Sequence, residues 1–396
     1  MQNEIYIGDN LAVMKSKDFQ KYIDKIKMIY IDPPYNTQND KCYNDKNTSD
    51  DWIKFMSKRF EVSKQLLKSD GVIFISIDDN EYANLKVLCD SIYGKDNFVG
   101  TFITQQAQRS NAKHINTVHE YILCFAKDKK KLHKFVINRM EIPEDKKMID
   151  KLTRDVKKII EKDGLDVANK KLKDIIKDYC YNYNITWLRN YSNVDENGNI
   201  YFSVDLSTPG KPRSVDIESI GLHLKPLPTR GWSSDKKFIE LYNENRLCFK
   251  DGRPYAKHYL YESEDNVPSI LKFFSRQGTN DLKKLGIGNL FDTPKPVDML
   301  KFLIRISTGN GDIVLDYFAG SGSLAQAVYE TNIEDNKNIK YVLVQIKEPV
   351  NPKSDVYKAC KDFGILPTVD EIMKFRINYY LKSKKMEDEI KYIEIN

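Results

Sequence analysis

The stretch that decides the fold is Tyr30-Ile31-Asp32-Pro33-Pro34-Tyr35-Asn36. It follows the apolar run Ile26-Lys27-Met28-Ile29, which predicts a buried parallel strand that runs into a loop at its carboxyl end. In an open α/β sheet, ligands bind at this end of the strands. The two prolines lack N–H groups and have a fixed φ, so the strand must end there and the loop must be stiff.

A stiff loop can hold Asp32 and Tyr35 in one geometry. This pair could grip a flat ring that bears an amino group, because the carboxylate accepts from the amine while the aromatic side chain stacks on the ring. The alternative interpretation is a Pro-Pro turn that ends the strand and leaves a solvated aspartate. The choice between the two depends on a second stretch far downstream.

The second stretch is Asp316-Tyr317-Phe318-Ala319-Gly320-Ser321-Gly322, which follows the apolar residues 313–315. A strand, a glycine turn and a helix start form the arrangement by which a backbone approaches a nucleotide-like ligand. The full pattern of three glycines is absent, so a pyrophosphate ligand is not favoured. The next expected strand, residues 339–346, carries Gln345 at its end and is followed by Glu348; these are the polar candidates for contacting a ribose.

Composition restricts the class of protein only loosely. A chain of 396 residues can form a catalytic domain with a smaller second domain, or one domain with a large insertion. The net charge of +6 is compatible with a polyanionic partner. Six cysteines without a CxxC or Cys/His cluster predict a reduced, cytoplasmic protein with no metal site. No signal peptide or membrane span is expected.

The pattern between the two stretches changes in character. Strands are expected at 72–77, 98–104 and 121–125, and the last two are expected to pair with each other. Near Lys127 the chain becomes highly charged, and residues 180–265 are dense in aromatic and basic side chains without α/β alternation. Such residues could bind nucleic acid, or the aromatic ones could form the core of a small β-rich domain.

The α/β pattern returns at Thr293-Pro294-Lys295-Pro296, which precedes an expected helix over Val297–Ser307. The tail, residues 366–396, is expected to be helical. Asp9 follows a short apolar run and is expected either to cap a helix or to contact a ligand.

Together the Asp-Pro-Pro-Tyr loop and the Phe-x-Gly-x-Gly loop resemble those of the DNA amino-methyltransferases that use S-adenosylmethionine. Their order along the chain, with a large insertion between them, is similar to that of the β class. Within this class the chain resembles the adenine-N6 group, which includes the Mod subunits of type III restriction-modification systems. Further similar stretches are Gly8-Asp9, residues 70–79, residues 119–123 and Lys295-Pro296.

The resemblance implies a doubly wound, mostly parallel, seven-stranded Rossmann-like methyltransferase sheet. Residues 1–126 and 285–396 would form the catalytic domain, and residues 127–284 an inserted target-recognition domain that binds DNA. The implied partners are double-stranded DNA, a second copy of the chain and a restriction subunit.

The resemblance also implies a division of labour among the site residues. Asp32 and the Pro33 carbonyl would accept the two N–H groups of a flipped-out adenine amine, and so stabilise the transition state of methyl transfer. The implied catalytic residues are Asp32, Pro33, Pro34 and Tyr35. The implied S-adenosylmethionine-binding residues are Asp9, Lys295, Pro296, Asp316, Phe318, Ala319, Gly320, Gly322 and Gln345.

Other functions remain to be distinguished. The same chemistry could act on cytosine N4, on RNA or on a glutamine side chain. A DNA-binding specificity subunit without catalytic activity would retain the same fold. A nicotinamide dehydrogenase is disfavoured, because the third glycine and a His-Asp proton relay are missing.

Overall fold

The computed structural model describes residues 2–36, 48–105 and 114–395. Their contacts divide the chain into two units. Unit 1 comprises residues 1–135 with 268–396, and unit 2 comprises residues 136–267. Residues 127–135 and 268–284, which the sequence assigns to the insertion, belong to unit 1. One reason is that strand β16 (Ile270–Phe274) pairs with strand β4 (Phe98–Gln105).

Unit 1 is built on a nine-stranded sheet. The order is β16, β4, β5 (His119–Ala126), β3 (Leu67–Ile77), β2 (Ile26–Ile31), β17 (Ile313–Asp316), β18 (Lys340–Gln345), β1 (Glu4–Ile7) and β19 (Lys391–Glu394). Only β5 runs antiparallel to its neighbours, so the predicted mostly parallel Rossmann-like sheet is confirmed. The strand number of seven is too low, because β16 and β19 extend the two edges.

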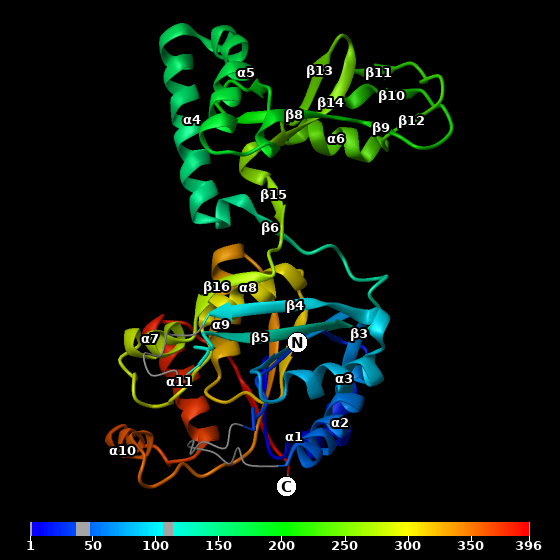
Figure 1. Ribbon diagram of the computed structural model, residues 1–396. Helices are drawn as coiled ribbons and strands as arrows, with labels where there is room; N and C mark the ends of the chain where they lie inside the picture. The colour runs from blue at the N-terminus through cyan, green and yellow to red at the C-terminus, as the bar shows by residue number, and fades with distance from the viewer. Residues whose placement is uncertain (1, 37–47, 106–113, 396) are drawn as a thin grey trace. The chain divides into compact units, whose positions relative to one another are not determined.

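Helices cover both faces of this sheet (Figure 1). One group contains α1 (Asn10–Lys15), α2 (Ser49–Leu66) and α3 (Tyr82–Tyr93), and the other contains α8 (Val297–Ser307), α9 (Ser323–Asp335) and α11 (Val369–Ser383). The remaining helices of unit 1 are α7 (Arg276–Lys284) and α10 (Asp355–Asp362), with 3-10 turns η1 (Lys17–Tyr22) and η2 (Lys95–Asn97). One hydrophobic core joins α1, α2 and α3 to the sheet.

The sequence predicted a helical tail over residues 366–396, but the tail is helical only in part. Helix α11 ends at Ser383, and β19 then pairs in parallel with β1. Gly8 permits this close pairing, because a Cβ at this position would lie 2.4 Å from the Ile395 carbonyl oxygen. A short apolar run within a charged tail carries too little periodicity to reveal such an edge strand.

The topology creates the site. Carboxyl ends of parallel neighbouring strands meet at one edge of a sheet, and this edge receives Asp9, Asp32, Asp316 and Gln345. Because β5 runs in the opposite direction, its amino end lies at the same edge. Glu120, near the start of β5, therefore joins the other polar residues there.

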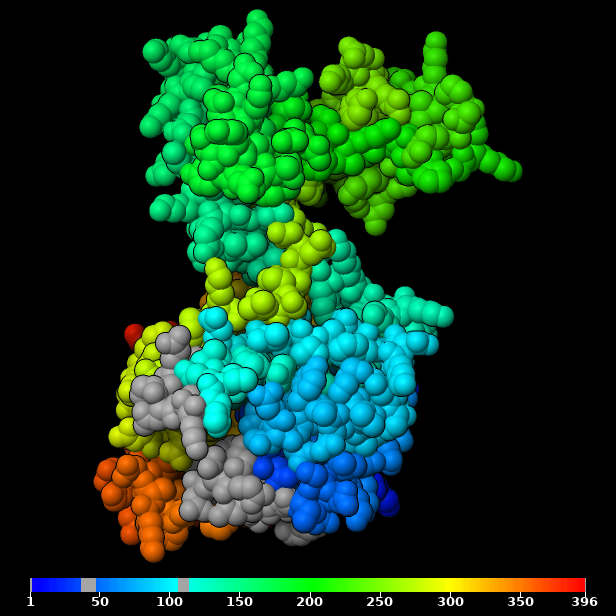
Figure 2. All heavy atoms as spheres, in the orientation of Figure 1, coloured from blue at the N-terminus to red at the C-terminus, as the bar shows by residue number. Residues whose placement is uncertain are grey.

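Unit 2 contains two hydrophobic cores, and Figure 2 shows two lobes in this part of the chain. One core lies under α4 (Pro143–Asp163) and α5 (Leu165–Asn182); the other packs against α6 (Asp235–Asn243). The strands are β6 (Val136–Asn138), β7 (Asn193–Val194), β8 (Ile200–Asp205), β9 (Ser207–Thr208), β10 (Val215–Ile217), β11 (Leu222–Leu224), β12 (Gly231–Trp232), β13 (Leu247–Lys250), β14 (Arg253–Tyr259) and β15 (Glu264–Asn266). The 3-10 turns are η3 (Arg139–Glu141), η4 (Trp187–Asn190), η5 (Glu218–Ile220) and η6 (Leu260–Glu262).

Some aromatic residues of unit 2 form its core, and others are exposed on its surface. Tyr191 and Trp232 are buried, and the Trp232 indole N–H donates to the Lys225 carbonyl oxygen at 2.9 Å, so this tryptophan belongs to the core. In contrast, Tyr181 is 87% exposed and Phe249 is 56% exposed. Across the described residues, no helix is long and apolar enough to cross a membrane.

Candidate active site

The Asp-Pro-Pro-Tyr loop leaves β2 and is held by side chains of unit 1. The Trp52 indole N–H donates to the Pro34 carbonyl oxygen at 2.7 Å. Asn36 adopts a left-handed conformation with φ of 58°, and its amide donates to the Glu81 carboxylate at 2.8 Å. These bonds, together with the two prolines, fix the direction in which Asp32 leaves the sheet.

The glycine loop between β17 and α9 is equally constrained. Gly320 and Gly322 have φ values of 52° and 76°, in the left-handed region that favours glycine. The Gly320 N–H donates to the Gln345 side-chain oxygen at 2.8 Å, and the Phe318 N–H donates to the Asp316 carboxylate at 2.9 Å. The backbone of this loop therefore follows the carboxyl ends of β17 and β18 closely.

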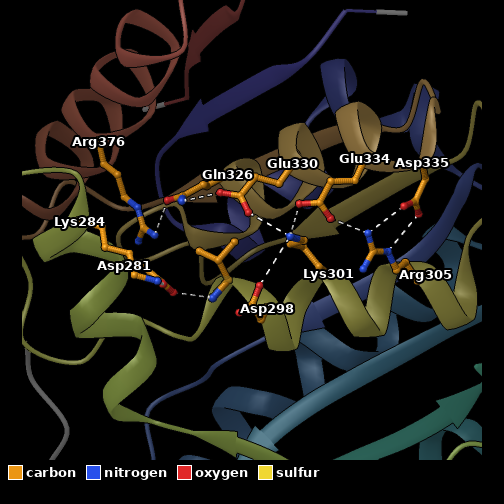
Figure 3. Close-up of polar contacts among 11 residues, drawn as sticks. Asp281, Lys284, Asp298, Lys301, Arg305, Gln326, Glu330, Glu334, Asp335 and Arg376 are labelled. Atoms are coloured by element: carbon orange, nitrogen blue, oxygen red, sulfur yellow. Dashed lines mark hydrogen bonds and ion pairs between the residues drawn. The ribbon is translucent and has the colours of Figure 1, made fainter. Parts of the chain in front are cut away.

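A buried arginine supports the glycine loop from behind. Arg376 of α11 is 1% exposed and donates to the hydroxyl groups of Ser321 and Ser323, at 2.7 Å each. It also donates to Gln326 at 2.9 Å (Figure 3). Burial lowers the pKa of Arg376 to about 10. The guanidinium thus ties α11 to the start of α9.

Helices α8 and α9 are joined by an ion-pair network (Figure 3). The Lys301 ammonium lies 3.2 Å from Glu330 and 2.6 Å from Glu334, and Arg305 pairs with Glu334 and Asp335. This network holds the middle and last turn of α8 against the second half of α9, the helix that follows the glycine loop.

Both predicted loops line one cavity of about 240 Å³. Nine of the predicted site residues line it: Asp9, Asp32, Pro34, Lys295, Asp316, Phe318, Ala319, Gly320 and Gln345. Four others do not line it: Pro33, Tyr35, Pro296 and Gly322. Pro296 and Gly322 instead precede α8 and α9 as their N-terminal caps.

Helix α2 supplies residues that the sequence did not assign to the site. The Arg59 guanidinium lies 2.9 Å from the Asp9 carboxylate and 2.5 Å from the Asn10 side-chain oxygen, and both Arg59 and Phe55 line the cavity. Asp9 also caps α1 by accepting from the Ala12 N–H at 2.9 Å. Arg59 follows Trp52 by seven residues and Phe55 by four, the spacing of one helix face, and a charged residue in such an apolar series is the signal that could have identified it.

Lys295 lies at the centre of a charged cluster. Its ammonium is 3.1 Å from the Asp32 carboxylate, 3.1 Å from the Glu120 carboxylate and 2.6 Å from the Tyr35 hydroxyl. The loop before α8 is fixed by Gly278 of α7, where a Cβ would lie 1.8 Å from the Pro294 carbonyl oxygen. The structure therefore brings Lys295 to the Asp-Pro-Pro-Tyr loop as well as to the cavity.

Burial controls the protonation of the site's acids. It raises the pKa of Asp316 to about 8, and the negative charge of Asp32 adds to this shift. Burial also raises the pKa of Asp32, against the attraction of Lys295. The pKa of Lys295 is raised because Asp32 and Glu120 outweigh the effect of burial. The pKa of Tyr35 is raised well above its usual range by burial and by the same two carboxylates.

A match to the DNA methylase family covers residues 26–349. The chain belongs to this family. The match confirms the DNA methyltransferase family that the two loops predicted, and it includes the Asp-Pro-Pro-Tyr loop, the glycine loop and all of unit 2. The roles of the individual residues in this DNA methylase stay predictions.

The DNA methylase is similar to several curated proteins. The EcoP15I Mod subunit of a type III restriction-modification enzyme from Escherichia coli is 30% identical, over 90% of this chain and 60% of its own length. The EcoPI Mod subunit from Escherichia phage P1 is 31% identical, over 90% of this chain and 59% of its own length. The type II methyltransferase M.KpnI from Klebsiella pneumoniae is 28% identical, over 97% of this chain and 90% of its own length.

Solved structures cover nearly the whole chain at low similarity. The cytosine-N4-specific PvuII DNA methyltransferase aligns with 99% of this chain and 95% of its own, with a TM-score of 0.43 and 12% identity. The chain spans about 60% of the length of the EcoP15I and EcoPI Mod subunits.

The raised pKa of Asp316 predicts a pH-dependent cost to stability. Since this carboxyl holds its proton to about pH 8 in the folded state but has an ordinary value of 3.8, stability should fall as pH rises between these values. Asp316→Asn keeps an acceptor for the Phe318 N–H and removes the cost. The free energy of unfolding of Asp316→Asn, relative to that of the wild type, should therefore increase by up to about 1.4 kcal/mol for each unit by which the pH is raised in this range.

Denaturant unfolding without added ligands, at several values from about pH 5.5 to about pH 8, measures this difference. Asp362→Asn, at an exposed position at the end of α10, is the control, and its difference from the wild type should stay constant. A constant difference for Asp316→Asn as well would show that this carboxyl does not retain its proton.

The crowding at Gly322 predicts a loss of stability. A Cβ there would lie 3.0 Å from Met373 and 3.1 Å from Ile377, and φ is 76°. Gly311 has a similar φ of 80°, but its added Cβ would meet nothing within 4 Å. Gly311→Ala should therefore cost about 1–2 kcal/mol, from the backbone conformation alone. Gly322→Ala should cost more, and equal losses in denaturant unfolding would contradict the crowding.

Proposed function

We propose that this DNA methylase transfers a methyl group from S-adenosylmethionine to the exocyclic N6 of an adenine in double-stranded DNA. The observation that carries the proposal is that Asp32 and the glycine loop line one cavity of about 240 Å³. An acceptor for an amine and a backbone suited to a nucleotide-like ligand thus meet in one place. The names of the curated relatives, Mod subunits and a type II methyltransferase, support the same assignment.

The cavity has the donor set that the cofactor would need. Asp9, Asp316, Phe318 and the backbone of Gly320 line it and would hold the adenosine and methionine parts. Gln345 at the end of β18 and Glu348, which follows this strand, both line the cavity and are the candidates for the ribose contact. When bound, S-adenosylmethionine supplies a methyl group that is already activated as a sulfonium.

Asp32 would act on the amine of the flipped adenine. By accepting an N–H bond it keeps electron density on N6 as this atom becomes tetrahedral. The N6 lone pair forms the new N–C bond while the C–S bond breaks and its electron pair stays on sulfur. N6 then releases one proton, which the Asp32 carboxylate can accept and pass to solvent. Tyr35, which is 5% exposed, would have to present more of its ring before it could stack on the base.

Unit 2 would recognise the target DNA. Its surface carries exposed aromatic side chains, among them Tyr181 and Phe249, which could stack on bases. Flipping a base out of a duplex costs a few kcal/mol, which contacts of this kind offset. A second copy of the chain and a restriction subunit are the further partners that we propose. An enzyme with this substrate would work in the cytoplasm.

Loss of Asp32 should abolish methyl transfer. We expect Asp32→Ala and Tyr35→Ala to lower the rate at least about 100-fold, because each removes a group at the acceptor. The assay incubates unmethylated genomic DNA with methyl-labelled S-adenosylmethionine and identifies the modified nucleoside by mass spectrometry. Thermal unfolding confirms that each variant is folded, and Asp362→Asn should retain the full rate. A normal rate in Asp32→Ala would refute the mechanism.

The same assay separates the alternative functions. N6-methyladenine is the expected product. Recovery of N4-methylcytosine would retain the chemistry but change the acceptor base. Cofactor binding without any labelled DNA would favour a specificity subunit without catalytic activity.

A further inference from the structure

Glu120 and Lys295 reach the acceptor side of the site from two separate parts of unit 1. Glu120 lies near the amino end of β5, the one antiparallel strand in the described sheet, and Lys295 lies on the loop before α8. The Lys295 ammonium donates to the Tyr35 hydroxyl at 2.6 Å and to the Glu120 carboxylate at 3.1 Å, and it forms an ion pair with Asp32 at 3.1 Å. The ammonium is therefore held by groups from two elements, the Asp-Pro-Pro-Tyr loop and β5.

We propose that Glu120 is a positioning residue for methyl transfer: it holds the Lys295 ammonium between the two carboxylates, and together the two charges set the basicity of Asp32. The inference rests on the proposed function, because it assigns the cluster to the acceptor side of the same reaction. It differs from the role that the resemblance implies for Lys295, which is contact with the cofactor.

The two oxygen atoms of Asp32 have different surroundings. Oδ1 is buried and forms an ion pair with the Lys295 ammonium at 3.1 Å, but it has no hydrogen-bond partner among the described residues. The side chain as a whole is 27% exposed, so its exposure belongs to the other atoms, which include Oδ2. Oδ1 is thus anchored by the lysine, and Oδ2 is the oxygen that can accept from the adenine amine.

The charges that face Asp32 come from every element around it. Lys295 favours its ionised form, whereas Glu120 from β5 opposes it. Asp316 from β17 keeps its proton to about pH 8 and therefore adds little charge beside Asp32 at neutral pH. Tyr30 and Tyr35 flank it on β2 and the following loop, and their raised pKa values keep both hydroxyl groups neutral. Because burial already disfavours a charged Asp32, removing Lys295 would leave a carboxyl that retains its proton at neutral pH and cannot accept from the amine.

Glu120 has the opposite influence. Its negative charge, shared through Lys295, raises the pKa of Asp32 and makes it a stronger proton acceptor. Activity requires ionised Asp32, so the rate should rise with pH through the pKa of this group. This rise is the acid limb of the pH–rate profile. Removing the charge of Glu120 should move the acid limb to lower pH, and removing the charge of Lys295 should move it to higher pH. A purely structural role would lower the rate without moving the limb in opposite directions.

The experiment measures kcat against pH at saturating S-adenosylmethionine and DNA. Glu120→Gln should shift the acid limb down by about one pH unit, and Lys295→Met should shift it up by about one to three units. Lys295→Arg, which keeps the charge, should restore the limb towards the wild-type position. Asp79→Asn is the matched control: it removes an acid at the same edge of the sheet that bonds to Tyr121 instead of Lys295, and its limb should not move.

A second measurement does not require catalysis. In protein labelled with ¹⁵N-lysine, the Lys295 ammonium held by Tyr35, Glu120 and Asp32 should give a slowly exchanging NMR signal. The signal should be lost in Glu120→Gln and retained in Asp79→Asn. If Glu120→Gln does not fold, Glu120→Asp replaces it. This variant has a side chain that is shorter by one methylene, so its carboxylate lies farther from Lys295 and the Lys295 signal should weaken.

The outcomes separate the two proposals. A wild-type protein that transfers no methyl group to DNA overturns the proposed function, and this inference with it. Wild-type transfer combined with an unmoved limb in Glu120→Gln and Lys295→Met overturns the positioning role alone. Limbs that move in the same direction, or a Lys295 signal that persists without Glu120, also overturn it.

Discussion

The site depends on the parallel pairing of β2 with β17. These strands come from distant parts of the sequence, and their register places the two carboxyl ends side by side. This pairing brings Asp32 and Asp316 to the same end of the sheet, because each lies at the carboxyl end of its strand. Reversing either strand would carry its aspartate to the opposite edge of the sheet. The other site residues are added around this pair.

Gathering acids at one edge has an electrostatic cost, and the structure limits it in two ways. Asp316 is buried and keeps its proton to about pH 8, so it adds little negative charge at neutral pH. Asp32 and Glu120 share the Lys295 ammonium instead. An isolated buried carboxylate would be strongly disfavoured, whereas a carboxylate with a fixed cation beside it can remain ionised. The charge of Asp32 is therefore balanced by a lysine that is distant from it in the sequence.

Groups behind the cavity hold its wall in place. Arg376 fixes the serines of the glycine loop, and the ion pairs of Lys301 and Arg305 hold α8 against α9. Close backbone approach at Gly278 leaves no room for a Cβ, and the side chains of Met373 and Ile377 crowd Gly322. These contacts explain how the glycine loop and the loop before α8 can line a defined cavity, because the rigidity comes from the helices beside them.

The sequence by itself determined the elements that carry local signals. Two prolines after an apolar run, and two glycines between a strand and a helix, each require a particular backbone, so both loops and the mostly parallel sheet could be predicted. The tertiary structure alone decided which side chains meet. Glu120 joins the site because β5 is antiparallel, and Arg59 joins it because α2 packs beside Asp9. Strand β19 joins the sheet because β1 had an open edge for pairing. Such contacts arise between segments far apart in the chain, and no local pattern of residues specifies the distance between them.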